Sequence, residues 1–337
     1  MNIEAREGTP GDIEEIIALF EGKDQFLSMM WSSMGDEVKS FHVRSLRSRA
    51  HLIGQGGDFK VFVAERSGDR KAVAYLVLFL DIVETITGEK QGFIFDYAVS
   101  PDHAGGDALP LLFRKAEEAV REREIQYLVM EIFAQDKEGE KRAFREGFGK
   151  EMNRIILRTA VKPLPRHDPD PFIVRKAQSE DLFFVLWLNT QCASFTIPSG
   201  RDRPKDDVQY RYLRIYSELS LEESEDFTAL IIEDAVKETP VGYLLFKTNA
   251  CDAITGARLG YVYDIAIHPD YWGKRAAQRL MKEGINLLSE KGIPFCLADI
   301  SEGNQRALKT AIKSIGFHLE SIRWMKKLGV IESASGA

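Results

Sequence analysis

The chain has 337 residues, of which 44% are hydrophobic and 29% are charged, and its 45 basic and 52 acidic side chains give a net charge of −7. This length and composition indicate a globular protein of two domains and exclude a disordered, collagen-like or coiled-coil chain. The negative net charge disfavours general nucleic-acid binding, because that affinity comes mostly from neutralised phosphates.

The sequence also indicates in which compartment the protein works and whether it binds metal. The cysteines, Cys192, Cys251 and Cys296, form no CxxC pair, and the histidines show no ligand spacing, so neither a disulfide framework nor a metal site is predicted. No N-terminal secretory pattern is present, and no apolar run approaches the roughly 18–20 residues of a membrane span. We therefore expect a cytoplasmic protein without a membrane partner.

The first half of the chain carries the signals of a mixed α/β domain. A helix is predicted to begin at Asp12, and the apolar stretch from Gly92 predicts a strand that ends before Pro101. The helix that follows has one apolar face, formed by Leu109, Leu112, Phe113, Ala116 and Val120.

A proline-rich stretch lies near the midpoint, with four prolines in residues 163–171. Proline fixes φ and restrains the residue before it, so this stretch predicts a stiff, extended linker. We predict an N-terminal domain over 1–162, the linker over 163–171, a C-terminal domain over 172–328 and a flexible tail over 329–337.

In the second half, β-branched and aromatic runs predict strands over residues 172–176, 228–232, 241–247, 259–267, 295–300 and 318–327. Helices are predicted from Ser179, over 206–219, from 276 to the stop at Gly292, and over 306–315 between Asn304 and Gly316. The third helix has one apolar face, formed by Ala277, Leu280, Met281, Gly284, Ile285 and Leu288.

The two halves repeat each other. Residues 92–105 align without gaps on residues 260–273 at an offset of 168, and six of the fourteen pairs are identical. Gly147-Phe148 recurs as Gly316-Phe317 at an offset of 169, so one residue is inserted or lost in between. A repeat of this length is too long for a solenoid unit and indicates a duplicated domain.

The segment from Ile265 to Leu280 runs from a strand through a proline and a glycine-containing loop into a helix. A helix N-terminus with small residues before it can bind phosphate through its unpaired backbone N–H groups. Lys274, Arg275 and Arg279 add local positive charge. Two interpretations stand at this point, a phosphate site and an ordinary strand-to-helix turn.

These features together resemble the Gcn5-related N-acetyltransferase (GNAT) superfamily. Its pyrophosphate loop, Arg/Gln-Gly-x-Gly-x-Gly/Ala, corresponds to Trp272–Ala277, and its Asn, Ala and Gly-Phe positions correspond to Asn304, Ala307 and Gly316-Phe317. The resemblance covers both halves. It implies an α/β (α+β) fold of two tandem GNAT-like domains, each a mixed, mostly antiparallel central sheet flanked by helices.

The resemblance implies an N-acyltransferase that uses acyl-CoA, with acetyl-CoA as the expected co-substrate, and acts on an amine of a small molecule or peptide. Backbone groups of the central strand would hold the pantetheine arm and polarise the thioester carbonyl. The coenzyme A residues that it implies are Ile265, Ala266, Ile267, Trp272, Gly273, Lys274, Arg275, Ala276, Ala277 and Asn304. A monomer or a homodimer is expected.

The two loops depart from the family pattern to different degrees. In the second copy Trp272 replaces Arg or Gln, and Arg275 stands at the second glycine. In the first copy Asp107 would repel a pyrophosphate, Leu109 replaces a small residue and Pro110 removes a donor. We therefore predict that the first copy is degenerate and that the second binds CoA.

Two acids of the second copy are candidate catalytic residues. Asp264 lies within an apolar strand, where it is either a general base or acceptor anchor, or a hydrogen-bonded acid that fixes the strand. Asp299 aligns with Glu131 of the first copy. It either faces the cleft or is a solvated strand end, and the second interpretation is favoured.

Many GNAT enzymes place a tyrosine in the last helix to protonate the departing thiolate. In this chain the corresponding position is Ala311 when counted forward from Asn304, and Ile312 when counted back from Gly316. The thiolate then leaves unassisted, or Tyr271 or water assists it. The rival hypothesis is a non-catalytic acyl-CoA sensor or a tandem GNAT scaffold.

The segments 24–57 and 191–225 precede the central strands and are expected to decide which acceptor binds. They are rich in charged and aromatic residues. The second segment contains basic residues that either face an anionic acceptor or form a solvated basic face, and the latter is favoured. These residues are Arg201, Arg203, Lys205 and Arg211.

Overall fold

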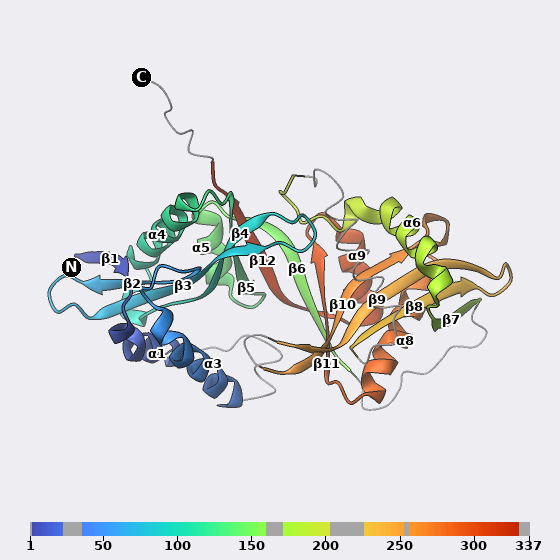
Figure 1. Cartoon of the computed structure of the whole chain (residues 1–337), viewed down its shortest axis with the longest axis horizontal. Coiled ribbons are helices and arrows are strands. Elements are labelled where there is room, and N and C mark those ends of the chain that lie inside the picture. Colours follow the sequence, from blue (N-terminus) through green and yellow to red (C-terminus); the bar gives the residue numbers. More distant parts are fainter. Residues whose placement is uncertain (1, 23–35, 160–170, 203–225, 253–255, 330–337) are drawn as a thin grey trace, which may run out of the picture. The chain divides into compact units, whose positions relative to one another are not determined.

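The computed structural model describes residues 2–22, 36–159, 171–202, 226–252 and 256–329. The predicted linker up to residue 170, the predicted helix over 206–219 and the predicted tail from 330 lie outside these ranges. The chain forms two compact units, whose elements Figure 1 labels. Unit 1 comprises residues 1–84, 89–150 and 321–337, and unit 2 comprises residues 85–88 and 151–320.

The sheet of unit 1 has the strand order β1-β2-β3-β4-β5-β12. Its pairs are antiparallel except for the parallel pair β4–β5. The strands are β1 (Ile3–Glu7), β2 (Phe59–Arg66), β3 (Ala72–Val83), β4 (Lys90–Val99), β5 (Tyr127–Phe133) and β12 (His318–Lys327). The helices are α1 (Ile13–Glu21), α3 (Asp36–Arg49), α4 (Ala108–Glu122) and α5 (Lys137–Arg145).

The sheet of unit 2 has the strand order β7-β8-β9-β10-β11-β6, again with one parallel pair, β10–β11. The strands are β6 (Gly149–Arg158), β7 (Phe172–Lys176), β8 (Phe227–Asp234), β9 (Thr239–Cys251), β10 (Arg258–Ile267) and β11 (Phe295–Ser301). The helices are α6 (Leu182–Cys192), α8 (Ala276–Glu290) and α9 (Gln305–Thr310). Each strand predicted for the second half is present.

Helices cover both faces of the sheet of unit 2, as Figure 1 shows for α6 and α8. Along β8 the side chain of Ile231 packs with Val185 of α6, and that of Ile232 packs with Leu280 of α8. This alternation follows from the strand geometry, in which successive side chains point to opposite faces. The predicted class, a mixed and mostly antiparallel sheet flanked by helices, is confirmed.

An ion pair at the start of each unit repeats the same local structure. Arg6 binds both carboxylate oxygens of Asp12, with the shorter contact at 2.7 Å, and Arg175 binds Asp181 in the same way at 2.7 Å. The guanidinium of Arg6 lowers the pKa of Asp12 to about 2. Each pair ties the first strand of a unit to the start of its first helix.

Each unit contains a last strand that comes from the other half of the sequence. Strand β6 pairs with β11 of unit 2 from Met152 to Arg158, and β12 pairs with β5 of unit 1 from Ser321 to Lys327. The domains predicted over 1–162 and 172–328 therefore differ from the compact units by this exchange. The sequence does not reveal it, because the two strands occupy equivalent positions of the repeat.

A buried ion pair fixes β6 in unit 2. The guanidinium Nε of Arg201 donates to Oε1 of Glu151, and both side chains have 0% exposure. The prediction that Arg201 faces an anionic acceptor or belongs to a solvated basic face is therefore wrong. Arg203, Lys205 and Arg211 lie outside the described residues.

We expect Glu151→Ala to lower the free energy of unfolding by about 3–5 kcal/mol, because it leaves the buried Arg201 guanidinium without its carboxylate. The double variant Glu151→Leu/Arg201→Met should recover much of this loss, since it removes both charges. Urea denaturation followed by circular dichroism measures both effects.

The control is Glu14→Ala, which breaks the exposed pair of Glu14 with Arg47 and should leave the urea midpoint unchanged. A stability loss no larger for Glu151→Ala than for this control would contradict the role assigned to the buried pair.

Candidate functional site

The parallel pairing of β10 with β11 ends early and leaves an opening in the sheet of unit 2. Residues 260–262 pair with 296–298, whereas β10 continues to pair with β9 as far as Ile267. On the side of β11, the backbone of residues 263–267 therefore lies at an open edge. Such an edge can bind an extended ligand through main-chain hydrogen bonds.

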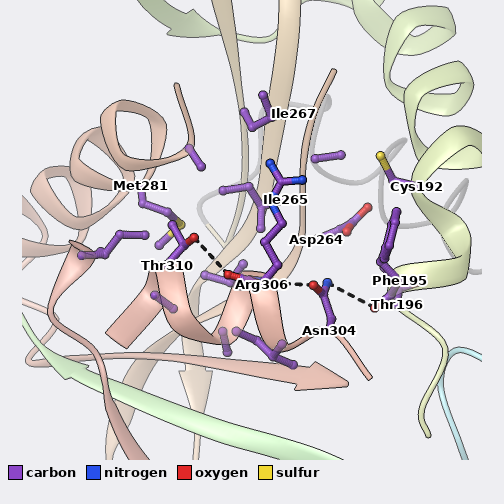
Figure 2. Close-up of a pocket in the computed structure, with 18 of the residues that line it drawn as sticks. Cys192, Phe195, Thr196, Asp264, Ile265, Ile267, Met281, Asn304, Arg306 and Thr310 are labelled. Atoms are coloured by element: carbon purple, nitrogen blue, oxygen red, sulfur yellow. Dashed lines mark hydrogen bonds between the residues drawn. The ribbon is translucent and has the colours of Figure 1, made fainter. Parts of the chain in front are cut away.

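A cavity of about 570 Å³ occupies this opening. Figure 2 shows Ile265 and Ile267 of β10, Cys192 of α6 and Thr310 of α9 around it. Lys274 does not line the cavity and lies over the ring of Tyr271, 4.8 Å from its centroid. The other predicted site residues all line it: Asp264, Ile265, Ala266, Ile267, Trp272, Gly273, Arg275, Ala276, Ala277, Asp299 and Asn304.

A β-bulge in β10 decides which side chains point to each face. The register with β9 shifts between Val262 and Asp264. Tyr263 and Asp264 consequently both lie on the face of α6, whereas Val262 and Ile265 pack on the face of α8. An extra residue in a strand re-aims its neighbours in this way, and here it directs the Asp264 carboxyl toward α6.

Asp264 is buried and held by hydrogen bonds. Its Oδ2 accepts from the Tyr243 hydroxyl at 2.5 Å and from Asn189 Nδ2 at 2.8 Å. Burial raises the pKa of Asp264 above its ordinary 3.8, while these two donors and the N–H of Ile265 oppose the shift. The contacts match the interpretation of Asp264 as an acid that fixes the strand, and a catalytic role remains a prediction.

Asp299 is held by an arginine that the sequence analysis missed. Arg154 of β6 donates from Nε to Oδ1 at 3.0 Å and from Nη2 to Oδ2 at 3.1 Å. The Tyr261 hydroxyl also donates to Oδ2, at 2.8 Å. The favoured interpretation of Asp299 as a solvated strand end is therefore wrong, because its carboxylate is 15% exposed and ion-paired.

The tyrosine contact of Asp264 and the strand position of Arg154 recur in unit 1. The Tyr75 hydroxyl donates to Oδ2 of Asp96 at 2.5 Å, as in the equivalent pair of unit 2. Glu131 of β5 faces Arg323 of β12 in the register of the sheet. The arginines of β6 and β12 stand 169 residues apart. That spacing is the signal from which the sequence could have identified Arg154.

The loop between β10 and α8 contains two residues in the left-handed region, Gly273 with φ +78° and Arg275 with φ +67°. They occupy the positions of the two family glycines. A Cβ added to Gly273 meets no atom within 4 Å, so the space beside it is open. Arg275 caps α8 in a conformation that L-residues rarely adopt, and the free N–H groups of the helix begin there.

The corresponding loop of unit 1 has a different conformation. Gly105 and Gly106 both have φ outside the positive range. Asp107 stands at the N-cap of α4, and Pro110 lies in the first turn of that helix. The predicted degeneracy of the first copy stays a prediction, but its loop lacks the left-handed positions of the second.

Trp272 covers the end of β10. Its indole Nε1 donates to the carbonyl of Ile267 at 2.7 Å. The guanidinium of Arg306 lies over the indole, 4.0 Å from the ring centroid, and Phe195 contacts the ring edge to face, with centroids 6.1 Å apart. The first loop position thus carries a packed aromatic side chain where the family has Arg or Gln.

Asn304, which the resemblance implies as a coenzyme A residue, caps α9. Its Oδ1 accepts from the N–H of Ala307 at 3.1 Å, and its Nδ2 donates to the carbonyl of Phe195 at 3.4 Å. Figure 2 shows Asn304 between α9 and the segment that contains Phe195. The cap therefore also ties α9 to the segment that follows α6.

A π-helical turn, Ala311–Ile315, follows α9. Such a turn contains one extra residue, which accounts for the change of the repeat offset from 168 to 169 and for the two positions counted for the family tyrosine. Ala311 lines the cavity and is buried. Tyr271, the alternative acid, donates its hydroxyl to Oδ2 of Asp234 at 2.8 Å.

Two structural findings concern metals and membranes. Over the described ranges, no group of three or more His, Cys, Asp or Glu side chains is arranged to hold a metal ion. Among the helices of the same ranges, none is long and apolar enough to span a membrane.

The raised pKa of Asp264 predicts how its contribution to stability changes with pH. The protonated carboxyl is favoured in the fold, so the contribution is complete below the ordinary pKa of 3.8 and is lost as the pH rises through the raised value. Relative to Asp264→Asn, the wild type should be most stable at low pH and lose that advantage toward neutral pH. Urea denaturation of both proteins from pH 4 to pH 8 measures the difference, and an advantage that grows with pH would contradict the assignment.

The family comparison concerns mainly the second half of the chain. The model of the acetyltransferase (GNAT) family matches residues 184–317, which contain the opening, the loop and α9. No curated protein matches the chain in sequence.

The fold comparison extends over both halves. A GCN5-related N-acetyltransferase from Sphaerobacter thermophilus has a TM-score of 0.58 at 15% identity, with 96% of this chain and 95% of that chain covered. A fungal glucosamine N-acetyltransferase region within a GH3 β-N-acetylglucosaminidase has a TM-score of 0.55 at 14% identity. The match covers 96% of this chain and 38% of that chain. A tandem GNAT protein of the clavulanic acid biosynthesis pathway has a TM-score of 0.49 at 13% identity. The match covers 97% of this chain and 99% of that chain. The GNAT family model thus matches part of the second half of the chain, and the similarity to the Sphaerobacter protein shows the same fold along its length.

Proposed function

We propose that unit 2 binds acyl-CoA, with acetyl-CoA as the expected donor, and transfers the acyl group to an amine of a small molecule or peptide. The match of the GNAT family model to residues 184–317 supports N-acetyltransferase activity in general. One observation carries the assignment to unit 2. The open edge of β10 and the left-handed loop before α8 border one cavity.

The open edge of β10 suits the pantetheine arm. The arm carries amide groups that can pair with the backbone of residues 263–267 as an added strand would. Apolar side chains of β10, α8 and the π-helical turn after α9 line the rest of the cavity, among them Ile267, Met281 and Ala311. Bound acyl-CoA supplies an acyl group activated as a thioester, and backbone N–H groups of β10 are the donors that would polarise its carbonyl.

The loop before α8 suits the pyrophosphate. Its left-handed residues lead into the free N–H groups of the first turn of α8, where the helix dipole also favours an anion. Lys274 and Arg275 add positive charge at this point of a chain with a net charge of −7. The open space beside Gly273 lets the backbone approach the phosphates closely.

The two acids of the cavity differ in the role that they can take. Both carboxylate oxygens of Asp299 are already engaged, by the Arg154 guanidinium and, at Oδ2, also by the Tyr261 hydroxyl. Asp264 has only neutral donors, and burial raises its pKa. We therefore assign proton uptake from the attacking amine to Asp264 and the orientation of Tyr261 to Asp299.

A non-catalytic acyl-CoA-binding protein is the second candidate, and one observation favours it. Ala311, one of the two positions that correspond to the family tyrosine, lines the cavity and cannot donate a proton. The alternative donor Tyr271 is engaged by Asp234. This candidate shares the binding site proposed above and differs only in turnover.

The repeat offers a matched pair of variants for testing the site. Gly273→Asp places a carboxylate beside the proposed pyrophosphate and should weaken acetyl-CoA binding about tenfold or more, which corresponds to ~1.4 kcal/mol. Aspartate tolerates the left-handed conformation better than most residues. Gly105→Asp, the same change in the loop of unit 1, should leave the affinity unchanged. Isothermal titration calorimetry measures both, with circular dichroism as the check of folding.

A thiol-release assay with acetyl-CoA and a panel of amines decides between the two candidates. Thiol release that depends on the amine, and that is slower in the Asp264→Asn variant, supports the transferase. Binding without release for any amine supports the binding protein. Absence of acetyl-CoA binding, or a loss caused by Gly105→Asp rather than Gly273→Asp, would contradict the site in unit 2.

A further inference from the structure

Asn189 of α6 is a polar side chain buried against the sheet of unit 2. It is 4% exposed, and its neighbours along the helix, Val185 and Leu188, belong to the apolar core. Its Nδ2 donates to Oδ2 of Asp264 at 2.8 Å and to the Tyr243 hydroxyl at 3.1 Å. Burying an amide costs free energy unless hydrogen bonds offset it, and these two bonds hold the amide beside the Asp264 carboxyl.

The first repeat shows that the fold itself does not require an asparagine at this position. Helix α1 corresponds to α6 at the offset of 169, which places Phe20 at the position of Asn189. Phe20 is buried, and its side chain has no hydrogen-bond donor. The tyrosine–aspartate hydrogen bond is common to both units, whereas the amide donor at this position belongs only to the second repeat.

The other groups around Asp264 are neutral near pH 7. The titratable side chains that face it are Tyr243 of β9, Cys192 of α6 and Tyr263 of β10 itself, and β8 adds apolar side chains to the same cluster. Burial raises the pKa of Tyr243 and of Cys192, and the Asp264 carboxyl adds to both shifts. Among the described residues, no cation forms an ion pair with Asp264. Within that part of the chain, hydrogen bonds alone stabilise its ionised form.

Asn189 can act on the cavity only through Asp264. Asp264 lines the cavity, and Asn189 does not. Figure 2 shows the Asp264 carboxyl on the side of the cavity where Cys192 and Phe195 lie. Asn189 and Tyr243 both donate to Oδ2, and Oδ1 accepts from neither. A hydrogen bond to the ionised form of an acid favours that form, so the amide opposes the effect of burial on this carboxyl.

We propose that Asn189 is a positioning residue, which orients the Asp264 carboxyl and stabilises its ionised form so that Oδ1 takes up the proton of the attacking amine. The inference rests on the proposed function, in which Asp264 is the base. In that transfer the amine nitrogen bonds to the acyl carbon, the C–S bond breaks and the CoA thiolate leaves. One proton passes from the nitrogen to Asp264.

The test is the pH dependence of kcat in the full chain, measured by thiol release from pH 5 to pH 9 at saturating acetyl-CoA and amine. The acid limb of this profile reports the base in the bound complex. Asn189→Leu keeps a side chain of similar size without a donor. It should move the acid limb up by about one pH unit, which is about a tenfold loss of rate on the acid side. Above the limb the rate should return to within about twofold of the wild type, because Asp264 is ionised there.

A second variant and a matched control complete the test. Asn189→Asp has the shape of the wild-type side chain but places a second carboxyl beside Asp264. It should move the acid limb further in the same direction, because a like charge disfavours ionisation, and it supplies the measurement if circular dichroism shows that Asn189→Leu does not fold. The control is Asn286→Leu, the same change at a buried asparagine of α8, which covers the other face of the sheet. It should leave the acid limb in place.

An acid limb at the wild-type pH in the folded Asn189 variants, with the rate reduced equally at every pH, would overturn the inference while the proposed function stands. An acid limb that persists unchanged in Asp264→Asn would overturn the role of Asp264 as the base and this inference with it, while acyl transfer in unit 2 stands. Absence of thiol release with any amine would overturn the proposed transferase together with the inference.

Discussion

The early end of the parallel pairing between β10 and β11 is the constraint on which the rest of the site depends. Three residues of β10 pair with β11, and the following five pair with β9 alone or lie in the bulge. The separation exposes backbone hydrogen-bonding groups that a continuous sheet would use. It also makes room for the cavity and places the N-terminus of α8 at one end of it.

Duplication explains which contacts serve the fold and which distinguish the second repeat. The Arg6–Asp12 pair recurs in unit 2, and the Tyr75–Asp96 hydrogen bond recurs at Asp264, so these contacts maintain the domain. The left-handed loop before α8 has no counterpart in the corresponding loop of unit 1. The proposed pyrophosphate contact is assigned to this loop.

The sequence predicted the elements of the second half well, because β-branched runs and an apolar helix face are local signals. The loop before α8 was also predicted, since Gly273 marks a place where the backbone needs unusual freedom. The exchange of β6 and β12 was not predicted, because equivalent strands fit either sheet. Arg154 was missed for the same reason, as its partner Asp299 lies 145 residues away. The π-helical turn was not predicted either, because in the sequence it corresponds to a one-residue change in the offset between the two repeats.

A crystal structure of the full chain with bound CoA tests the central claim most directly. The pantetheine arm should lie along residues 263–267 of β10, and the pyrophosphate should lie at the loop that contains Gly273 and Arg275. Electron density for CoA beside β4 of unit 1, or anywhere other than the opening beside β10, would contradict this assignment.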